Sequence, residues 1–219
     1  MTAKIQFIIY ISVLVFTFGV SLKKLKGTEL SLKFICMLLG YTIITEILAA
    51  YMAIRFRQNL MIYHIYPSVS LAFIALYYNY SIKEFRQYKI GYFVAGFGFL
   101  AAILNTLYLQ PLKVMDSNVT LLAGVLIVMM AILSFYKIYM DESNLRFART
   151  PHFWLSVLFL FYYCTTFFLF GLMQYCLMKK MHTILQGMYW FLWSVNLIFY
   201  TGIGVIFLLT VPRKKYYGR

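Results

Sequence analysis

The chain has very few charged residues for its length, and acidic residues are the scarcest of them. Charged side chains make up 12% of the 219 residues, and only six are Asp or Glu. Hydrophobic residues account for 63% of the sequence, and the mean hydropathy is +0.79. Because an average soluble domain is roughly 25% charged, this composition excludes a water-soluble fold.

Cysteine is also scarce, and its placement argues against disulfides and metal sites. Cys36, Cys164 and Cys176 are odd in number and fall within or at the end of apolar stretches. We interpret them as small apolar packing residues. The sequence has no pair of histidines one helical turn apart, which a zinc hydrolase within the membrane would need. The last apolar stretch, 183–211, lacks the lysine that a retinal pigment requires. We therefore predict no metal and no cofactor.

Seven long apolar stretches fill most of the chain. A helix needs roughly 20 mostly apolar residues to cross a hydrocarbon core of ~30 Å. Strands of membrane barrels alternate apolar and polar residues, whereas 121–133 and 153–161 are apolar almost without a break. We therefore predict an all-α, polytopic integral membrane protein that forms a single seven-helix transmembrane domain. The predicted spans are 5–22, 31–53, 60–80, 90–109, 118–139, 152–176 and 183–211.

The distribution of Lys and Arg predicts how the chain is oriented. If the N-terminus lies outside, the cytoplasmic side receives 14 of the 20 basic residues and the outer side receives 6. The cytoplasmic clusters then lie around Lys24, Lys83, Arg146 and Lys215. Since cytoplasmic loops carry the excess of basic residues, we predict the N-out, C-in orientation.

The formal net charge of +14 does not indicate a nucleic-acid-binding protein. The basic residues fall at the predicted helix ends, where they interact with anionic lipid headgroups. The aromatic fraction of 20% has a similar explanation, because Tyr and Trp concentrate at membrane interfaces. We therefore expect membrane lipids, and no nucleic acid, as partners.

Polar residues within the spans are the candidates for function, because a polar group in the membrane must be satisfied without water. Glu46 is the one carboxylate well inside a predicted span. His64, Asn105, Gln174 and Gln186 come from four other spans, and the proposed topology places them at similar depth near the outer side. We expect these side chains to converge on one ligand-binding pocket.

Pro67 adds a second indication within the third span. It follows Tyr63-His64-Ile65-Tyr66, and a proline inside a helix removes one backbone hydrogen bond to the residue four positions back, here Tyr63. We predict a helix kink at Pro67 that opens a cavity beside His64, and we count Tyr63 among the ligand-binding residues. The alternative is that Pro67 lies in the first turns and merely starts the helix.

Glu46 and His64 are expected to form a pair. A single buried charge at this depth is costly, and a neighbouring ionisable group lowers that cost. The prediction is that the two side chains lie within hydrogen-bond reach or are bridged by one water.

Short segments in two spans carry a resemblance to known proteins. Asn59-Leu60 with Tyr63-His64-Ile65-Tyr66, and the segment 194–198, resemble a loosely defined group of small bacterial seven-helix membrane proteins of unknown function. The resemblance implies the architecture and a location in the bacterial cytoplasmic membrane. It implies no activity for any residue.

The function that these observations favour is receptor-like or sensory. The expected ligand is a small molecule or a lipid headgroup in an outward-facing pocket of polar and aromatic side chains. A signal would then pass to a cytoplasmic or membrane partner through the basic inner loops. Two alternatives stay open: a small-solute or proton-coupled transporter, and a lipid-modifying enzyme that uses Glu46 and His64 as acid and base.

Overall fold

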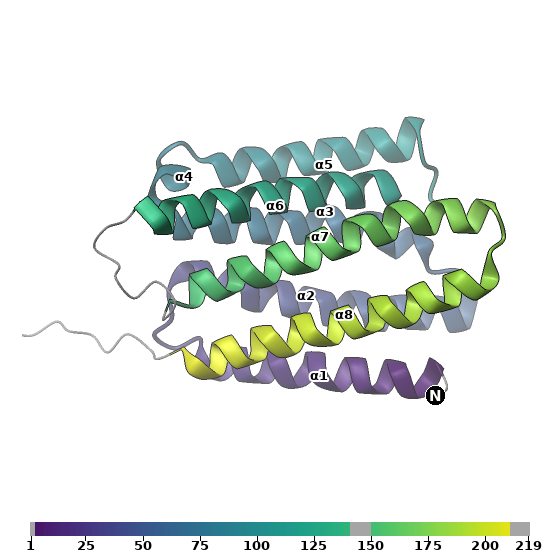
Figure 1. Ribbon diagram of the computed structural model, residues 1–219, viewed down its shortest axis with the longest axis horizontal. Coiled ribbons are helices and arrows are strands. Elements are labelled where there is room, and N and C mark those ends of the chain that lie inside the picture. Colours follow the sequence, from purple (N-terminus) through teal and green to yellow (C-terminus); the bar gives the residue numbers. More distant parts are fainter. Residues whose placement is uncertain (1–2, 141–149, 211–219) are drawn as a thin grey trace, which may run out of the picture.

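The protein is a bundle of long helices in the computed structural model, which describes residues 3–140 and 150–210 (Figure 1). Seven helices are long and apolar enough to cross a membrane, which confirms the predicted all-α, seven-span architecture. They are α1 (Ala3–Lys24), α2 (Leu30–Phe56), α3 (Leu60–Ser81), α5 (Ile90–Tyr108), α6 (Ser117–Met140), α7 (Pro151–Met178) and α8 (His182–Leu209).

The ends of the helices lie within a few residues of the predicted ones. The chain turns where a residue adopts a left-handed conformation, as at Gly27 (φ 97°), Arg57 (φ 53°) and Lys180 (φ 54°). The short helix α4 (Lys83–Gln87) was not predicted. It carries Glu84, which forms an ion pair with Lys137 of α6.

Six of the long helices form a ring, and α5 lies outside it. Around the ring, α1 packs against α2, α2 against α3, α3 against α6, α6 against α7, α7 against α8, and α8 against α1. Helix α5 packs mainly on the outer side of α3, at the edge of the bundle (Figure 1). The interior of the ring is therefore the place where side chains from distant parts of the sequence meet.

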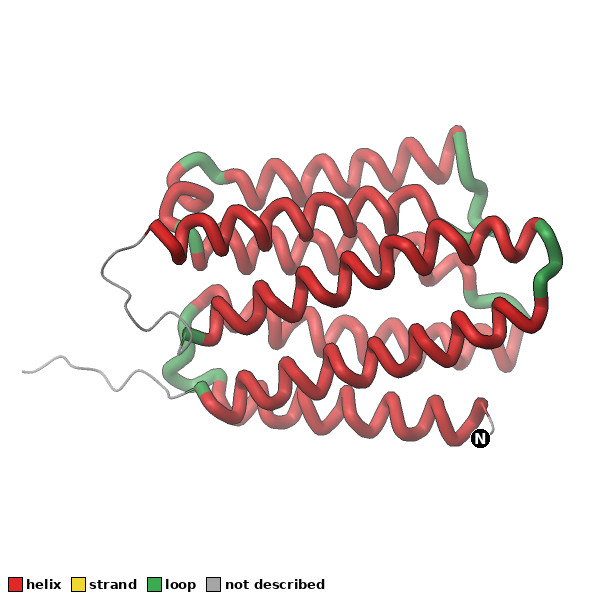
Figure 2. Tube along the Cα trace, viewed as in Figure 1, coloured by secondary structure: helices red, strands yellow, loops and turns green. Residues whose placement is uncertain are grey.

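The two ends of the bundle carry different connections (Figure 2). The end with the N-terminus, called the N end below, also carries the connections 57–59, 109–116 and 179–181. The opposite end carries the connections 25–29 and 82–89, together with the end of α8. Arg146, Lys215 and the other basic residues of 141–149 and 211–219 lie outside the described residues, and the predicted orientation stays a prediction.

Fully buried apolar side chains lie in the middle of the ring and toward the end away from the N end, among them Ile74, Ile127, Phe159, Ile203 and Phe207. We call this group the core layer. Beyond it, a hollow of about 1330 Å³ at the end away from the N end is lined by Glu29, His152 and residues of α7 and α8. The core layer lies below the cavity described next.

Candidate functional site

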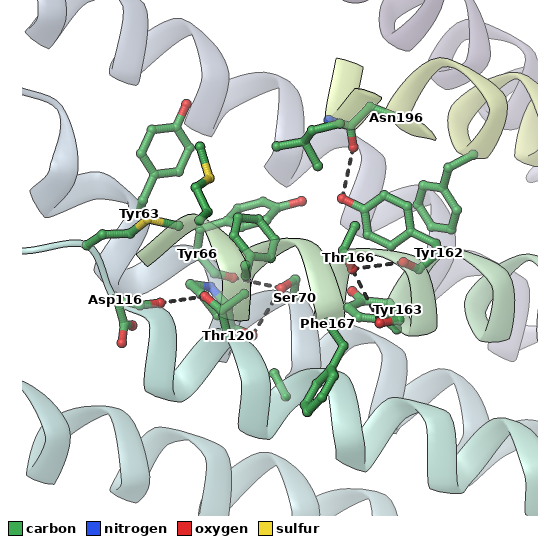
Figure 3. Close-up of a pocket in the computed structure, with 18 of the residues that line it drawn as sticks. Tyr63, Tyr66, Ser70, Asp116, Thr120, Tyr162, Tyr163, Thr166, Phe167 and Asn196 are labelled. Atoms are coloured by element: carbon green, nitrogen blue, oxygen red, sulfur yellow. Dashed lines mark hydrogen bonds between the residues drawn. The ribbon is translucent and has the colours of Figure 1, made fainter. Parts of the chain in front are cut away.

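A cavity of about 460 Å³ lies inside the ring, in the half nearer the N end. It falls within the range of roughly 300–1,000 Å³ that is common for small-ligand pockets. All six helices of the ring contribute to its wall, and none of the described wall residues comes from α5. Main contributors are Tyr10, Glu46, Tyr63, Tyr66, Thr120, Tyr162, Asn196 and Tyr200, several of which Figure 3 shows.

The cavity reaches the N end between the starts of α3 and α6. Asn59 and Leu60 lie at this rim on one side, and Met115 and Asp116 lie at it on the other. At the other limit of the cavity, Leu38 and Phe199 line it next to the core layer. The cavity therefore extends from the core layer to the N end of the bundle.

Glu46 is the carboxylate of this wall that comes from within a transmembrane helix. It lies about 15 Å from the end of α2, at 1.5 Å per residue. The hydroxyl of Tyr10 donates to one carboxylate oxygen at 3.1 Å, and the hydroxyl of Tyr63 donates to the other at 3.4 Å. The carboxylate thus connects α1, α2 and α3 through two uncharged donors.

Tyrosine side chains dominate the rest of the wall. The Tyr162 hydroxyl donates to the Asn196 side-chain oxygen at 2.9 Å, which joins α7 to α8. The Tyr162 ring stacks on Phe199 with ring centres 4.2 Å apart. Tyr66 shares a hydrogen bond of 3.3 Å with the Thr42 hydroxyl. The wall therefore offers ring faces held in fixed positions, together with hydroxyl and amide groups.

The charged side chains of the described cavity wall are all acidic. Among the described residues that line the cavity, none is Lys, Arg or His, whereas two are acidic, Glu46 and Asp116. The cavity is consequently favourable for positive charge.

Pro67 lies about two turns into α3, and not in its first turn. It also lines the cavity. The nearby Ser70 hydroxyl donates to the Tyr66 carbonyl at 2.8 Å and to the Pro67 carbonyl at 3.0 Å. The alternative that Pro67 only starts the helix is therefore wrong, while the bend predicted at this position stays a prediction.

The predicted pair of Glu46 and His64 is not formed by a direct hydrogen bond. Each group has other partners in the part of the chain that the structure describes. His64 is buried, its Nε2 lies 2.7 Å from the Val114 carbonyl oxygen, and its Nδ1 lies 3.4 Å from the Thr106 hydroxyl. Consecutive helical residues point about 100° apart, so Tyr63 can face the cavity while His64 faces α5 and the connection 109–116.

Asn105 belongs to a group of polar side chains around His64 and does not line the cavity. Its side-chain nitrogen donates to Gln110 at 3.1 Å and to Asp116 Oδ1 at 2.8 Å. Gln110 in turn donates to the Ser117 hydroxyl at 2.8 Å. We call His64, Asn105, Gln110 and Asp116 the loop cluster, because they fix the connection 109–116 against α3 and α5.

Asp116 belongs to both the loop cluster and the cavity rim. It is 4% exposed, and its Oδ2 has no hydrogen-bond partner among the described residues. Burial raises the pKa of this carboxyl above its ordinary value, while the charge of the nearby His64 and the Val119 N–H oppose the shift. The group is therefore a buried acid at the entrance to the cavity.

The last two predicted residues lie elsewhere or are not described. Gln186 is exposed and does not line the cavity, because its neighbour Leu185 turns inward against Met173 and Cys176. Gln174 lies in α7, and its side chain is outside the described residues. Of the predicted ligand-binding residues, the structure therefore brings Glu46 and Tyr63 together at the cavity.

Sequence reasoning missed most of the tyrosines, Asn196 and Asp116. A signal for Asn196 was present, since Tyr189, Leu192, Asn196, Phe199 and Tyr200 recur at helical spacing and all line the cavity. Aromatic residues, however, are expected both at membrane interfaces and in interiors.

A further polar chain lies at the opposite end. His152 Nε2 lies 3.1 Å from Glu29 Oε2, and its Nδ1 lies 3.1 Å from the Tyr77 hydroxyl. These contacts join the start of α2 to α7 and α3. Within the described part of the chain, no three His, Cys, Asp or Glu side chains form a group that could hold a metal ion.

Comparison with known proteins adds nothing to this geometry. No protein-family model, curated protein or solved structure matches the chain.

Proposed function

We propose that the protein binds a small molecule in the central cavity and acts as a receptor-like membrane protein. The observation that carries the proposal is the cavity itself, which is built by six helices, is lined by fixed rings and hydroxyls, and extends to the N end. Convergent polar groups in a concave, largely apolar pocket are typical of ligand sites.

The packing below the cavity favours binding over transport. A transporter needs a pathway that opens toward each side in turn. Here the core layer, with Ile127, Phe159 and Ile203 fully buried, separates the cavity from the hollow at the opposite end.

The contacts of Glu46 and His64 favour binding over the enzymatic alternative. An acid and base pair must reach the same reacting atoms. Glu46 faces the cavity, whereas His64 is held by Val114 and Thr106 in the loop cluster.

A ligand could influence the opposite end through α8. This helix contributes Asn196 and Tyr200 to the cavity wall. Farther along, the Thr17 hydroxyl donates to the Tyr200 carbonyl at 3.0 Å, and Lys24 donates to the carbonyls of Leu208 and Thr210 at 3.3 and 3.1 Å. A movement of α8 relative to α1 would therefore be transmitted to the end of the bundle opposite the N end. We propose that a signalling partner binds at that end. We also propose the bacterial cytoplasmic membrane as the location.

The proposal is tested by filling the cavity. Gly124 lines it, and a Cβ placed there meets only Tyr163, at 3.8 Å. We expect Gly124→Leu to fold and to abolish the thermal stabilisation that a panel of small amines, alcohols and carboxylates gives the purified protein. The matched control is Gly96→Leu on α5, where a Cβ meets nothing within 4 Å.

The pattern of responses decides the outcome. A compound that stabilises the wild type and Gly96→Leu, but not Gly124→Leu, supports binding in the cavity. If every compound that acts stabilises all three proteins equally, or if none acts on the wild type, the proposed function is wrong.

A further inference from the structure

We propose that the ligand of the central cavity is an organic cation, a protonated amine with an apolar body, whose charge is held by Glu46. This inference rests on the proposed function and names the class of molecule that it concerns. It follows from the charges and the ring faces of the wall.

The first argument is the missing counter-charge of Glu46. Its two carboxylate oxygens accept hydrogen bonds from Tyr10 and Tyr63, which are neutral donors. No basic side chain occurs among the described wall residues. A carboxylate inside a membrane is costly unless a cation pairs with it or a proton neutralises it. A cationic ligand supplies the charge that the wall lacks.

The second argument is the arrangement of the aromatic rings. The hydroxyls of Tyr10 and Tyr63 contact Glu46 at 3.1 and 3.4 Å, and the rings of Tyr66 and Tyr162 line the same cavity. The face of an aromatic ring attracts cations through its quadrupole, and this attraction is strongest where water is excluded. Rings around a carboxylate therefore favour an ammonium group and its adjoining carbon atoms.

The third argument is the entrance. Asp116 lies at the rim with one carboxylate oxygen that has no hydrogen-bond partner among the described residues. An anionic ligand at the rim would lie near the buried Asp116 carboxyl, and deeper in the cavity it would lie near Glu46. It would find no positively charged side chain in the described wall, so anionic ligands are disfavoured at both points.

The experiment uses three probes of matched size and different charge. Phenethylamine is a cation at neutral pH, phenethyl alcohol is uncharged, and phenylacetate is an anion. Their binding to the full-length protein in detergent is measured by isothermal titration calorimetry. We expect phenethylamine to bind at least about tenfold more tightly than the alcohol, and phenylacetate to bind most weakly.

Glu46→Gln tests the role of the carboxylate. Gln keeps the size of the side chain and can still accept from Tyr10 or Tyr63. We expect it to weaken phenethylamine binding at least about tenfold and to leave phenethyl alcohol binding unchanged. Glu84→Gln is the control, because Glu84 lies outside the cavity in an ion pair with Lys137. It should leave the binding of all three probes unchanged.

The outcomes separate this inference from the function on which it rests. If phenethyl alcohol or phenylacetate binds as tightly as phenethylamine, and Gly124→Leu abolishes that binding, the cavity binds ligands but the cation inference is wrong. If Gly124→Leu leaves the binding of every probe intact, the proposed function itself fails. The order of affinities in the wild type decides the inference even if Glu46→Gln does not fold.

Discussion

At Glu46, two tyrosine hydroxyls take the place that a basic side chain fills in an ordinary buried ion pair. The arrangement satisfies the oxygens of the carboxylate and leaves its charge available to a third group. Among the described wall residues, Asp116 is the other acid, and its unpaired Oδ2 makes it the less satisfied of the two. In both cases a carboxyl group is buried away from water, and no basic side chain among the described wall residues pairs with it.

Asp116 should make stability depend on pH. Because its pKa in the folded protein is raised, the folded state holds this proton more tightly than the unfolded state does. Stability should therefore fall as the pH rises from the ordinary value of 3.8 through the raised pKa. We expect Asp116→Asn, which keeps an acceptor for Asn105, to lack this decrease.

The measurement is the thermal unfolding temperature of both proteins across that pH interval. Other groups of the protein also ionise in this interval, so the difference between the two proteins, and not either curve alone, reports the Asp116 carboxyl. Parallel curves for the wild type and Asp116→Asn would show that burial does not destabilise the ionised group.

Residues of α2 and α3 show how far the sequence could predict the site. Glu46, Tyr63 and Pro67 were predicted and all line the cavity, because a polar or helix-breaking residue inside a span needs an interior partner. His64 was predicted to pair with Glu46, yet it lies in the loop cluster. The rotation of a helix about its axis decides between these two positions. That rotation depends on contacts with α5 and α6, which no local pattern specifies.

At the scale of helices, composition predicted the seven spans, whereas their neighbours in space were not predictable. Length and apolarity determine whether a segment crosses a membrane, and both are local properties. The position of α5 outside the ring depends on close packing against α3. A Cβ added at Gly98 of α5 would lie 2.6 Å from the Leu71 side chain of α3. Small residues of this kind allow helices in membranes to approach closely.

Gly91 provides the test of this packing. A Cβ at Gly91 would collide with the Ala75 carbonyl oxygen and lie 2.5 Å from the Asn79 Cβ, and the Gly91 N–H donates to Asn79 Oδ1 at 3.1 Å. Since backbone cannot move aside as a side chain can, we expect Gly91→Ala to lower the free energy of unfolding by about 1–3 kcal/mol or more.

The matched control is Gly96→Ala on the same helix, where a Cβ meets nothing within 4 Å. It should leave stability unchanged or raise it by up to ~1 kcal/mol through helix propensity. Thermal or denaturant unfolding of both variants in the same detergent makes the comparison. Equal effects would mean that α5 is not held against α3 by close backbone contact.

For the whole molecule, the cavity and the packed core layer make the two halves of the bundle different. The half near the N end holds Glu46 and the tyrosines, whereas the other half holds fully buried residues such as Phe159 and Phe207. Under the proposed function, the ligand would therefore enter from the side of the membrane on which the N-terminus lies. The excess of basic residues at the opposite end predicts that this side is the outer one.

Labelling with a membrane-impermeant maleimide on intact cells tests the orientation. Single cysteines are placed in a variant that lacks Cys36, Cys164 and Cys176. We expect cysteines at Arg57 and Lys113, exposed near the N end, to react from outside. Cysteines at Lys26 and Lys83, exposed at the opposite end, and at Lys215 should react only after the membrane is permeabilised.

The cysteine variant without added sites is the control for background labelling, and the permeabilised sample shows that every site can react. Reaction at Lys26, Lys83 or Lys215 in intact cells, with Arg57 and Lys113 protected, would reverse the orientation. The cavity would then face the cytoplasm, and its cationic ligand would have to be an intracellular molecule. Because the ring, the cavity and the contacts of Glu46 are independent of orientation, this result would change the source of the ligand and leave its chemical class as proposed.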